Sequence, residues 1–357
     1  MKVDIFHLNF LRCPGDLWPG AFDGLPDPSL GRLIRMGRSW LERLRASREK
    51  LVVVSAREQP WFFSQKSGYA SAAGAFVRGF LKDPTEIIQM LLFLEVVRRR
   101  IPVALINRSD DGRLLTGSDW FYRRCHACFV RELHPLPEIA LRDLYTPSGG
   151  NPQTNRRARR ILSWFDPSCP TRRDISKLRP ISLGVRNETL ECFRGATGKK
   201  WDLFFAGDLH EKGLRGRMIE ELRELAGKRV WKILLRDRLP QEEYLYCLAQ
   251  SRLCLSPPGM GWDCWRHYEA MLAESVPVMP YPTILQYQPA LDGEHCFYFA
   301  PESGGLTLCL ERVMTQMDRL PAMAQAGRRL VLENHTYSKL REYVIRETLE
   351  AFARSQA

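Results

Sequence analysis

The chain alternates short β-branched runs with segments of helical periodicity, and this alternation constrains the fold more than any other feature. Lys2 to Asn9, Leu51 to Val54 and Ile101 to Asn107 predict strands, the last two of them buried. Leu30 to Leu44 and Pro84 to Arg100 predict helices between these strands. Strands and helices in alternation are typical of an α/β fold with a mainly parallel sheet.

The second half of the chain repeats this pattern. The predicted strands are Trp201–Ala206, Val230–Leu235, Leu253–Leu255 and Val276–Met279. The predicted helices span about 216–226, 241–250, 264–274, 305–318, 321–333 and 338–353. Between the halves, residues 146–180 are rich in proline, glycine and arginine, which predicts a partly mobile segment that crosses between two domains.

The net charge of +12 lies in the first half of the chain. Residues 1–180 contain 30 Lys/Arg and 18 Asp/Glu, whereas residues 181–357 contain 23 of each. A basic field favours anionic partners such as nucleic acid, a membrane surface or an acidic substrate, and a solvated face without a partner stays open. Because aromatic residues are not interleaved with the basic ones in a recognisable module, we predict no nucleic-acid partner.

The cysteines and the amino terminus indicate a cytoplasmic protein. The ten cysteines are irregularly spaced, which favours reduced thiols, and Cys125-His126-Ala127-Cys128 has no second pair to complete a zinc ribbon. We favour structural thiols there, beside a strand at Cys128–Val130, with a metal or redox site as the alternative. No signal peptide is visible, and the apolar run Ile87–Val97 is too short to span a bilayer, so any contact with the inner membrane face would be peripheral.

Residues Leu253 to Pro280 hold the most informative constellation, a strand followed by a Pro/Gly turn, a helix and a short strand. The turn predicts backbone N–H groups that face a ligand, and the helix amino terminus attracts phosphate. Trp262, Arg266 and Glu269 at i, i+4 and i+7 are expected to share one helical face. Arg266 can bind phosphate and Glu269 a ribose diol, whereas alone the two could form a surface ion pair.

This segment resembles the donor-binding region of GT-B glycosyltransferases, most closely that of the exostosin-like family. The matching residues are the turn Pro257/Pro258-Gly259, Arg266 and Glu269 on the helix, and Pro277-Val278 on the next strand. Glu274-Ser275 stands where the family has a small residue and a Gly or Cys, a mild departure.

Two further elements extend the resemblance to about residues 200–350. Phe204 to Gly207 is similar to the family's strand that ends in glycine, and it implies Arg215 or Arg217 as the pyrophosphate contact, unless both are solubilising loop residues. The segment Leu291–Phe297, with Ala326-Gly327-Arg328-Arg329 after it, is similar to the ends of many GT-B chains.

The resemblance implies an α/β GT-B fold in which two Rossmann-like domains face each other across a cleft. Residues 1–180 would form the acceptor-binding domain, including the linker of about 146–180. Residues 181–335 would bind the nucleotide-sugar, and residues 336–357 would form a helix that returns toward the first domain.

The resemblance also implies an inverting, metal-independent transfer. Retaining relatives carry Glu-x7-Glu ending at Glu269, but Gly261 occupies the first position. An inverting transfer needs a general base, and Asp110, Asp111 and Glu132 follow strands of the first domain, although Asp110-Asp111-Gly112 also fits a plain turn. We expect no metal and no cofactor besides the nucleotide-sugar co-substrate.

We therefore predict a glycosyltransferase that moves a sugar from a UDP- or GDP-sugar to a carbohydrate acceptor, as in polysaccharide biosynthesis. The basic first half favours an acceptor that is acidic or lipid-linked. The alternatives are a non-catalytic nucleotide- or carbohydrate-binding protein on a GT-B scaffold and, less directly, a GT-B epimerase.

Overall fold

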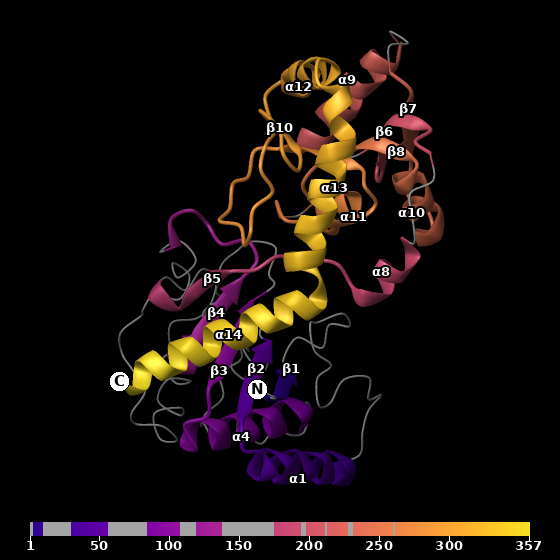
Figure 1. The fold of residues 1–357 in the computed structure, drawn as a ribbon. Helices are drawn as coiled ribbons and strands as arrows, with labels where there is room; N and C mark the ends of the chain where they lie inside the picture. Colours follow the sequence, from indigo (N-terminus) through magenta and orange to yellow (C-terminus); the bar gives the residue numbers. More distant parts are fainter. Residues whose placement is uncertain are drawn as a thin grey trace, which may run out of the picture. The chain divides into compact units, whose positions relative to one another are not determined.

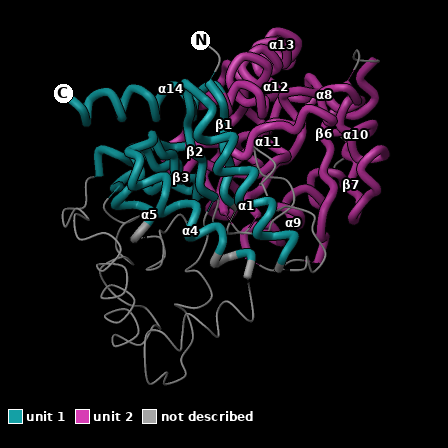
Figure 2. Tube along the Cα trace, turned by 90° about the horizontal axis from the view of Figure 1, so that it is seen from below, with its two compact units in different colours: residues 1–180, 342–357 teal, residues 181–341 magenta. Residues whose placement is uncertain are grey.

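The computed structural model describes residues 3–9, 30–55, 84–107, 119–137, 175–193, 198–210, 213–227, 231–259 and 261–357. The chain divides into two compact units, unit 1 with residues 1–180 and 342–357, and unit 2 with residues 181–341 (Figure 2). Each unit has its own parallel sheet. The predicted fold class, α/β with two units that each hold a parallel, Rossmann-like sheet, is confirmed.

The sheet of unit 1 has the order β1-β2-β3-β4-β5, and all of its strands are parallel. The strands are β1 (Asp4–Asn9), β2 (Lys50–Ser55), β3 (Val103–Asn107), β4 (Ala127–Val130) and β5 (Leu178–Pro180). The first four were predicted, but β5 lies in the segment that was predicted to cross between domains. Three residues ending in proline give no strand pattern, and proline is accepted there because β5 is the last strand of the sheet among the described residues.

The helices that the structure describes in unit 1 cover this sheet. They are α1 (Leu30–Ala46), α4 (Pro84–Arg98), α5 (Asp119–Arg124), the short η3 (Ile175–Lys177) and, from residue 342 on, α14 (Tyr337–Gln356). Helix α1 buries Leu33, Trp40 and Leu44 at helical spacing, and Trp40 meets Phe6 of β1 edge-on at 5.4 Å between ring centroids. The amphipathic pattern of α1 therefore determines which of its faces packs.

The sheet of unit 2 has the order β10-β9-β8-β6-β7, also all parallel; Figure 1 labels β6, β7, β8 and β10. The strands are β6 (Trp201–Ala206), β7 (Ile233–Arg236), β8 (Ser251–Leu255), β9 (Val276–Pro280) and β10 (Phe297–Phe299). The chain leaves β6 toward β7 on one side and returns to β8 on the other. The strand order thus reverses between β6 and β8, which makes a topological switch point at their carboxyl ends.

Helices cover both faces of this second sheet. They are α8 (Asn187–Cys192), α9 (Leu214–Gly227), α10 (Gln241–Ala249), α11 (Trp265–Leu272), α12 (Gly305–Met314), η4 (Met317–Arg319), α13 (Leu320–Leu330) and the π-turn η5 (Val331–His335). Leu203 and Phe205 pack into a core with α9 and α12, whereas Phe204 and Ala206 pack into one with α10 and α11. The alternation along β6 therefore feeds two cores, one on each face.

No helix in the described part of the chain is long and apolar enough to span a bilayer.

Candidate functional site

The carboxyl ends of β6 and β8 form the centre of the candidate site in unit 2. Strand β6 ends at Ala206 and continues into Gly207, and β8 ends at Leu255 before the turn of residues 256–259. A Cβ atom at Gly207 would lie 3.0 Å from the Phe205 ring and 3.5 Å from Nη2 of Arg266. Glycine therefore leaves room for a guanidinium directly above the strand end.

Arg266 bridges the two strand ends. From the first turn of α11 its Nη2 donates to the carbonyl of Ala206 at 3.2 Å, and its Nη1 donates to that of Pro257 at 3.4 Å. The guanidinium carbon lies 5.2 Å from the centre of the Phe205 ring. Its Nε is buried and has no acceptor among the described residues. A cation with an unused buried donor is thus held at the switch point, where α/β folds bind their ligands.

Arg215 joins Arg266 at the turn, and Arg217 does not. Nη2 of Arg215, at the start of α9, donates to the carbonyl of Pro258 at 2.8 Å. Arg217 instead donates to the carbonyl of Pro301 at 3.4 Å and is exposed. Of the two arginines that the resemblance implied, the structure therefore places Arg215 beside Arg266.

The turn itself differs from the prediction in one respect. The N–H of Gly259 donates to the carbonyl of Gly261 at 3.0 Å, so this group closes the turn and does not face a ligand. The turn presents carbonyls to the two arginines instead, those of Pro257 and Pro258. The candidate anion-binding groups at this turn are accordingly the guanidiniums of Arg215 and Arg266.

Glu269 lies one turn along α11 from Arg266 and is partly buried. Burial raises the pKa of its carboxyl above the usual range, while Tyr244 and the charge of Arg266 oppose this shift. The carboxyl is thus electrostatically coupled to the cation at the switch point.

The expectation that Trp262 shares a helical face with Arg266 and Glu269 is wrong. Helix α11 begins at Trp265, so Trp262 belongs to the preceding loop. The indole is 5% exposed, donates to the carbonyl of Pro280 at 3.2 Å and packs against His267. The loop residues Trp262 to Cys264 bend the chain into the core before the helix starts, which period counting does not detect.

A buried carboxylate, not identified from the sequence, fixes the approach to α11. Oδ2 of Asp263 accepts the backbone N–H of Leu183 at 2.7 Å, and Oδ1 accepts the hydroxyl of Tyr268 at 2.5 Å. Asp263 is 3% exposed. It ties Leu183, near the start of unit 2, to the helix that carries Arg266, and its position two residues before the first residue of that helix was the available sequence signal.

A second group beneath the turn combines His267, Cys264 and Ser256. Nδ1 of His267 lies 2.7 Å from the Ser256 hydroxyl and 3.5 Å from the Cys264 sulfur, and Nε2 lies 2.8 Å from the carbonyl of Trp262. Burial raises the pKa of the Cys264 thiol, but His267 and Arg266 outweigh it and lower the pKa to about 7. The sequence alone did not single out this group of three residues.

The predicted bases belong to unit 1. Asp110 and Asp111 lie outside the described residues. Glu132 follows β4, is 7% exposed, and lies 3.4 Å from the Arg131 guanidinium. Among the described residues no three His, Cys, Asp or Glu side chains converge as a metal-binding group. All three bases remain predictions.

Residues 205–284 match the family model of the RXYLT1 C-terminal domain. The match runs from the end of β6 past β9 and includes Gly207, Arg215, Arg266 and Glu269. The resemblance to the exostosin-like group that the sequence indicated is confirmed over these residues. No curated protein sequence matches the chain.

Solved structures of glycosyltransferases resemble the chain at low identity. Sucrose-phosphate synthase from Thermosynechococcus elongatus gives a TM-score of 0.42 and 10% identity over 94% of this chain and 82% of that one. Anabaena Alr3699/HepE in complex with UDP gives 0.45 and 12%, over 98% and 100%. The pneumococcal O-GlcNAc transferase GtfA in complex with UDP and GlcNAc gives 0.42 and 11% over 88% of this chain, which spans only 60% of GtfA.

Proposed function

We propose that this chain is a glycosyltransferase that binds a nucleotide-sugar at the carboxyl edge of the unit 2 sheet. One observation carries the proposal. Arg266 bridges β6 and β8 at the switch point and keeps a buried donor without an acceptor, within a segment that matches an exostosin-like family. A diphosphate has the charge and the oxygen atoms to satisfy such a group.

Each residue of the site has a role in this proposal. On donor binding, Arg266 and Arg215 would exchange weak contacts with carbonyls for charged contacts with the two phosphates. Glu269 would accept hydrogen bonds from the ribose diol, and Gly207 would leave room for the donor. The fixed guanidiniums would then stabilise the charge that grows on the departing diphosphate.

The transfer itself would be inverting and would use neither a metal nor a cofactor. The acceptor hydroxyl attacks the anomeric carbon, the bond to the diphosphate breaks with its electron pair, and a base takes the hydroxyl proton. Glu132, Asp110 and Asp111 of unit 1 are the candidate bases, and a UDP- or GDP-sugar is the donor. The basic first half favours an acidic or lipid-linked acceptor and peripheral contact with an anionic membrane.

The test is the melting temperature of the purified protein with UDP-, GDP-, CMP- and dTDP-sugars and their free nucleotides. A ligand that binds the native state raises the melting temperature, so we expect a rise with one nucleotide class and its loss in Arg266→Ala. Arg252→Ala is the matched control. Arg252 belongs to the same sheet but lies at the amino end of β8, paired with Asp202 at 2.7 Å.

A rise that Arg252→Ala keeps and Arg266→Ala loses supports the donor site and identifies the nucleotide. The absence of a rise with every nucleotide at millimolar concentration would overturn the proposal. If the protein binds a nucleotide-sugar but releases no nucleoside diphosphate with any acceptor supplied, the non-catalytic alternative is favoured.

A further inference from the structure

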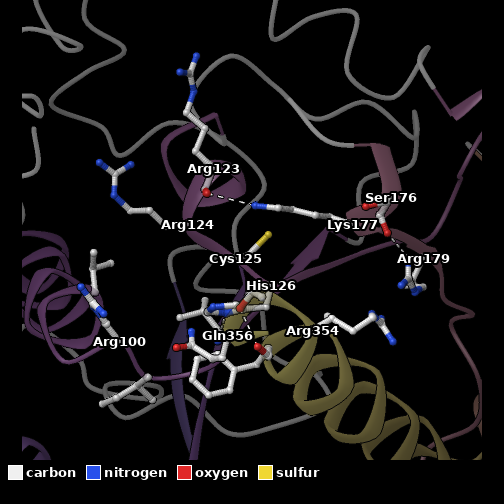
Figure 3. A pocket seen from close by; sticks show the side chains of 16 residues that line it. Arg100, Arg123, Arg124, Cys125, His126, Ser176, Lys177, Arg179, Arg354 and Gln356 are labelled. Atoms are coloured by element: carbon white, nitrogen blue, oxygen red, sulfur yellow. Dashed lines mark hydrogen bonds between the residues drawn. The ribbon is translucent and has the colours of Figure 1, made fainter. Parts of the chain in front are cut away.

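Unit 1 contains a cavity of about 560 Å³ at the amino-terminal edge of its sheet (Figure 3). Residues that precede β3, β4 and β5 line it, namely Arg100 and Ile101, Arg124 to His126, and Ser176 with Lys177. The end of α14 closes one side with Phe352 and Arg354. Its size is that of a small-molecule site.

The lining of this cavity is strongly cationic. Six of its sixteen residues carry a positive charge, namely Arg100, Arg123, Arg124, Lys177, Arg179 and Arg354. None of the sixteen is acidic. Behind the lining, Glu347 and Glu350 of α14 partly neutralise Arg179 at 3.1 Å and Arg354 at 3.9 Å. The cavity therefore keeps a net positive field, which a solvated surface of mixed charge would not have.

Contacts with the main chain hold two of these cations in place. The ammonium of Lys177 donates to the carbonyls of Arg123 at 3.2 Å and Tyr122 at 3.5 Å, at the carboxyl end of α5. Nη1 of Arg179 donates to the carbonyls of Ser176 and Leu178, at 2.5 and 2.9 Å. Cations that are held before a ligand arrives lose little side-chain entropy when it binds.

The cavity also offers an apolar wall beside the charges. Val97, Ala351 and Phe352 line it, and the Phe352 ring meets the His126 ring edge-on at 4.9 Å between centroids. Nδ1 of His126 accepts the backbone N–H of Val103 at 3.0 Å, so a neutral ring carries its proton on Nε2. A ligand with an anionic head and a carbon skeleton fits such a lining better than an inorganic ion alone.

The cavity lies away from the edge where α/β sheets usually bind substrates. Strands β3 and β4 run from the cavity toward Asn107 and Val130, after which the predicted base Glu132 follows. Strands of this length rise about 3.3 Å per residue, so the two edges are separated by roughly 13–17 Å. The cavity is thus distinct from the carboxyl edge of its own sheet.

We propose that this cavity is a binding site for the phosphate group of an organic phosphate, separate from the donor site of unit 2. Arginine and lysine around a pocket bind phosphate oxygens, and the wall of Val97, Ala351 and Phe352 receives the carbon skeleton. The ligand is either a soluble phosphate monoester or the headgroup of an anionic lipid. Both present the same phosphate chemistry to the cavity, and the proposal holds whether or not unit 2 transfers a sugar.

Two variants of the full-length protein test the proposal. Arg100→Gln with Arg354→Gln removes two exposed charges from the lining, and Ala351→Phe fills the cavity without changing the charge. The control is Arg32→Gln with Arg35→Gln, which removes the same charge from exposed positions near the start of α1. Because α1 ends just before β2 starts, its beginning lies toward the other edge of the sheet.

The probes are glycerol 3-phosphate, followed by calorimetry, and vesicles of phosphatidylcholine with or without phosphatidic acid, followed by co-sedimentation. We expect the wild type and the control to bind one of these phosphates, and both cavity variants to bind it at least about tenfold more weakly. Binding of glycerol 3-phosphate identifies a soluble ligand, and binding only to phosphatidic acid vesicles identifies a lipid headgroup. The proposal is overturned if the wild type binds neither, or if Ala351→Phe binds as the wild type does, since attraction is then a property of surface charge alone. Loss of the nucleotide-dependent rise in melting temperature in Arg266→Ala tests only the donor site of unit 2 and leaves the phosphate site of unit 1 unaffected.

Discussion

Cations gather at opposite edges of the two sheets, and they are held in different ways. In unit 2, Arg215 and Arg266 lie at the carboxyl edge and donate to carbonyls of β6 and of the turn that follows β8. In unit 1, Arg100 and Arg354 lie exposed at the amino edge, around an open cavity. In unit 2, individual guanidinium donors are held at defined positions. In unit 1, the exposed guanidiniums contribute mainly a positive electrostatic potential around the cavity.

The strand orders explain part of this difference. The order in unit 2 reverses between β6 and β8, and Arg266 lies at the switch point that this reversal makes at the carboxyl edge. The described strands of unit 1 follow one another in sequence order, without such a reversal. We therefore expect binding in unit 2 to depend mainly on the placement of two guanidiniums, and binding in unit 1 to depend more strongly on the exposed charges around the cavity.

The largest effect is expected from Asp263, the buried carboxylate that links Leu183 to helix α11. Asp263→Ala leaves the N–H of Leu183 and the hydroxyl of Tyr268 without their acceptor in a buried region. We expect the free energy of unfolding of unit 2 to fall by about 3–4 kcal/mol. Urea denaturation measures it, and Asp263→Asn, which keeps one acceptor oxygen, should lose about half as much.

Asp202→Ala is the control at the other edge of the same sheet. Asp202 accepts from Arg252 and from the N–H of Lys232, but it is accessible to water, so its loss should cost only about 1 kcal/mol. Equal losses of unfolding free energy in the two variants would show that the buried hydrogen bonds of Asp263 contribute no more than the accessible ones of Asp202. The proposed difference between the two edges of the sheet would then be wrong.

Acid should destabilise unit 2 through His335. Its ring contacts the Ser182 hydroxyl at 2.9 Å and the carbonyl of Gln288 at 3.0 Å, and burial lowers its pKa to about 4. Above pH 6.5 the ring is neutral in both the folded and unfolded states. As the pH falls from 6.5 to 4, the unfolded chain takes up a proton that the folded one excludes, so about 3 kcal/mol of stability is lost.

His126 gives the corresponding measurement in unit 1. Burial and the charge of Lys177 lower its pKa to about 4, and a phosphate in the cavity would offset that charge and raise the pKa. Proton NMR of the two rings should show a rise in the pKa of His126 on addition of the phosphate ligand and no rise in the pKa of His335.

His335→Gln should reduce the loss of unfolding free energy between pH 6.5 and pH 4. An unchanged loss in this variant would contradict the assignment of the acid effect to His335.

A smaller effect is expected from salt, which should weaken ligand binding more at the unit 1 cavity than at the unit 2 site. Exposed charges are screened beyond about 8–10 Å at physiological ionic strength, whereas buried pairs are screened much less. From low to physiological salt, we expect the affinity of the unit 1 cavity for phosphate to fall by about tenfold and that of unit 2 for nucleotide by about twofold or threefold. Calorimetry at several salt concentrations measures both affinities. If the two affinities depended equally on salt concentration, the proposed difference between placed donors in unit 2 and exposed charge in unit 1 would be wrong.

Much of this fold followed from local patterns. The runs Leu51–Val54 and Ile101–Asn107 and the amphipathic segment from Leu30 carry their own signal, because burial on a sheet or along one helical face dictates residue type at each step. Strand β5 carries no such signal, since three residues are too few for a period and pairing with β4 alone determines it. Long-range pairing of this kind is invisible to local counting.

The site was predictable to a similar degree. Arg266 and Glu269 could be singled out as candidates because the resemblance rests on local features, namely their spacing on a helix and the neighbouring turn. Asp263 and the cavity in unit 1 could not, because one partner of Asp263, Leu183, is 80 residues away and the cavity draws on residues 97 to 356. The basic excess of the first half was evident, but its concentration around one cavity depends on how β3, β4 and β5 bring their preceding residues together.

The smallest effect concerns the thiol of Cys264, which reports on the donor site without changing it. His267 and Arg266 lower its pKa to about 7 against the effect of burial, so a substantial fraction is thiolate at neutral pH. Since the thiolate is the reactive form, alkylation by iodoacetamide should be half-maximal near pH 7. A nucleotide that engages Arg266 would draw that cation from the thiol, so its binding should slow alkylation by about twofold or threefold. Mass spectrometry of the modified peptide measures the rate, with the exposed Cys192 as the internal control. A slowing at Cys192 as well would indicate a general effect of the nucleotide, and an unchanged rate at Cys264 would place the nucleotide away from Arg266.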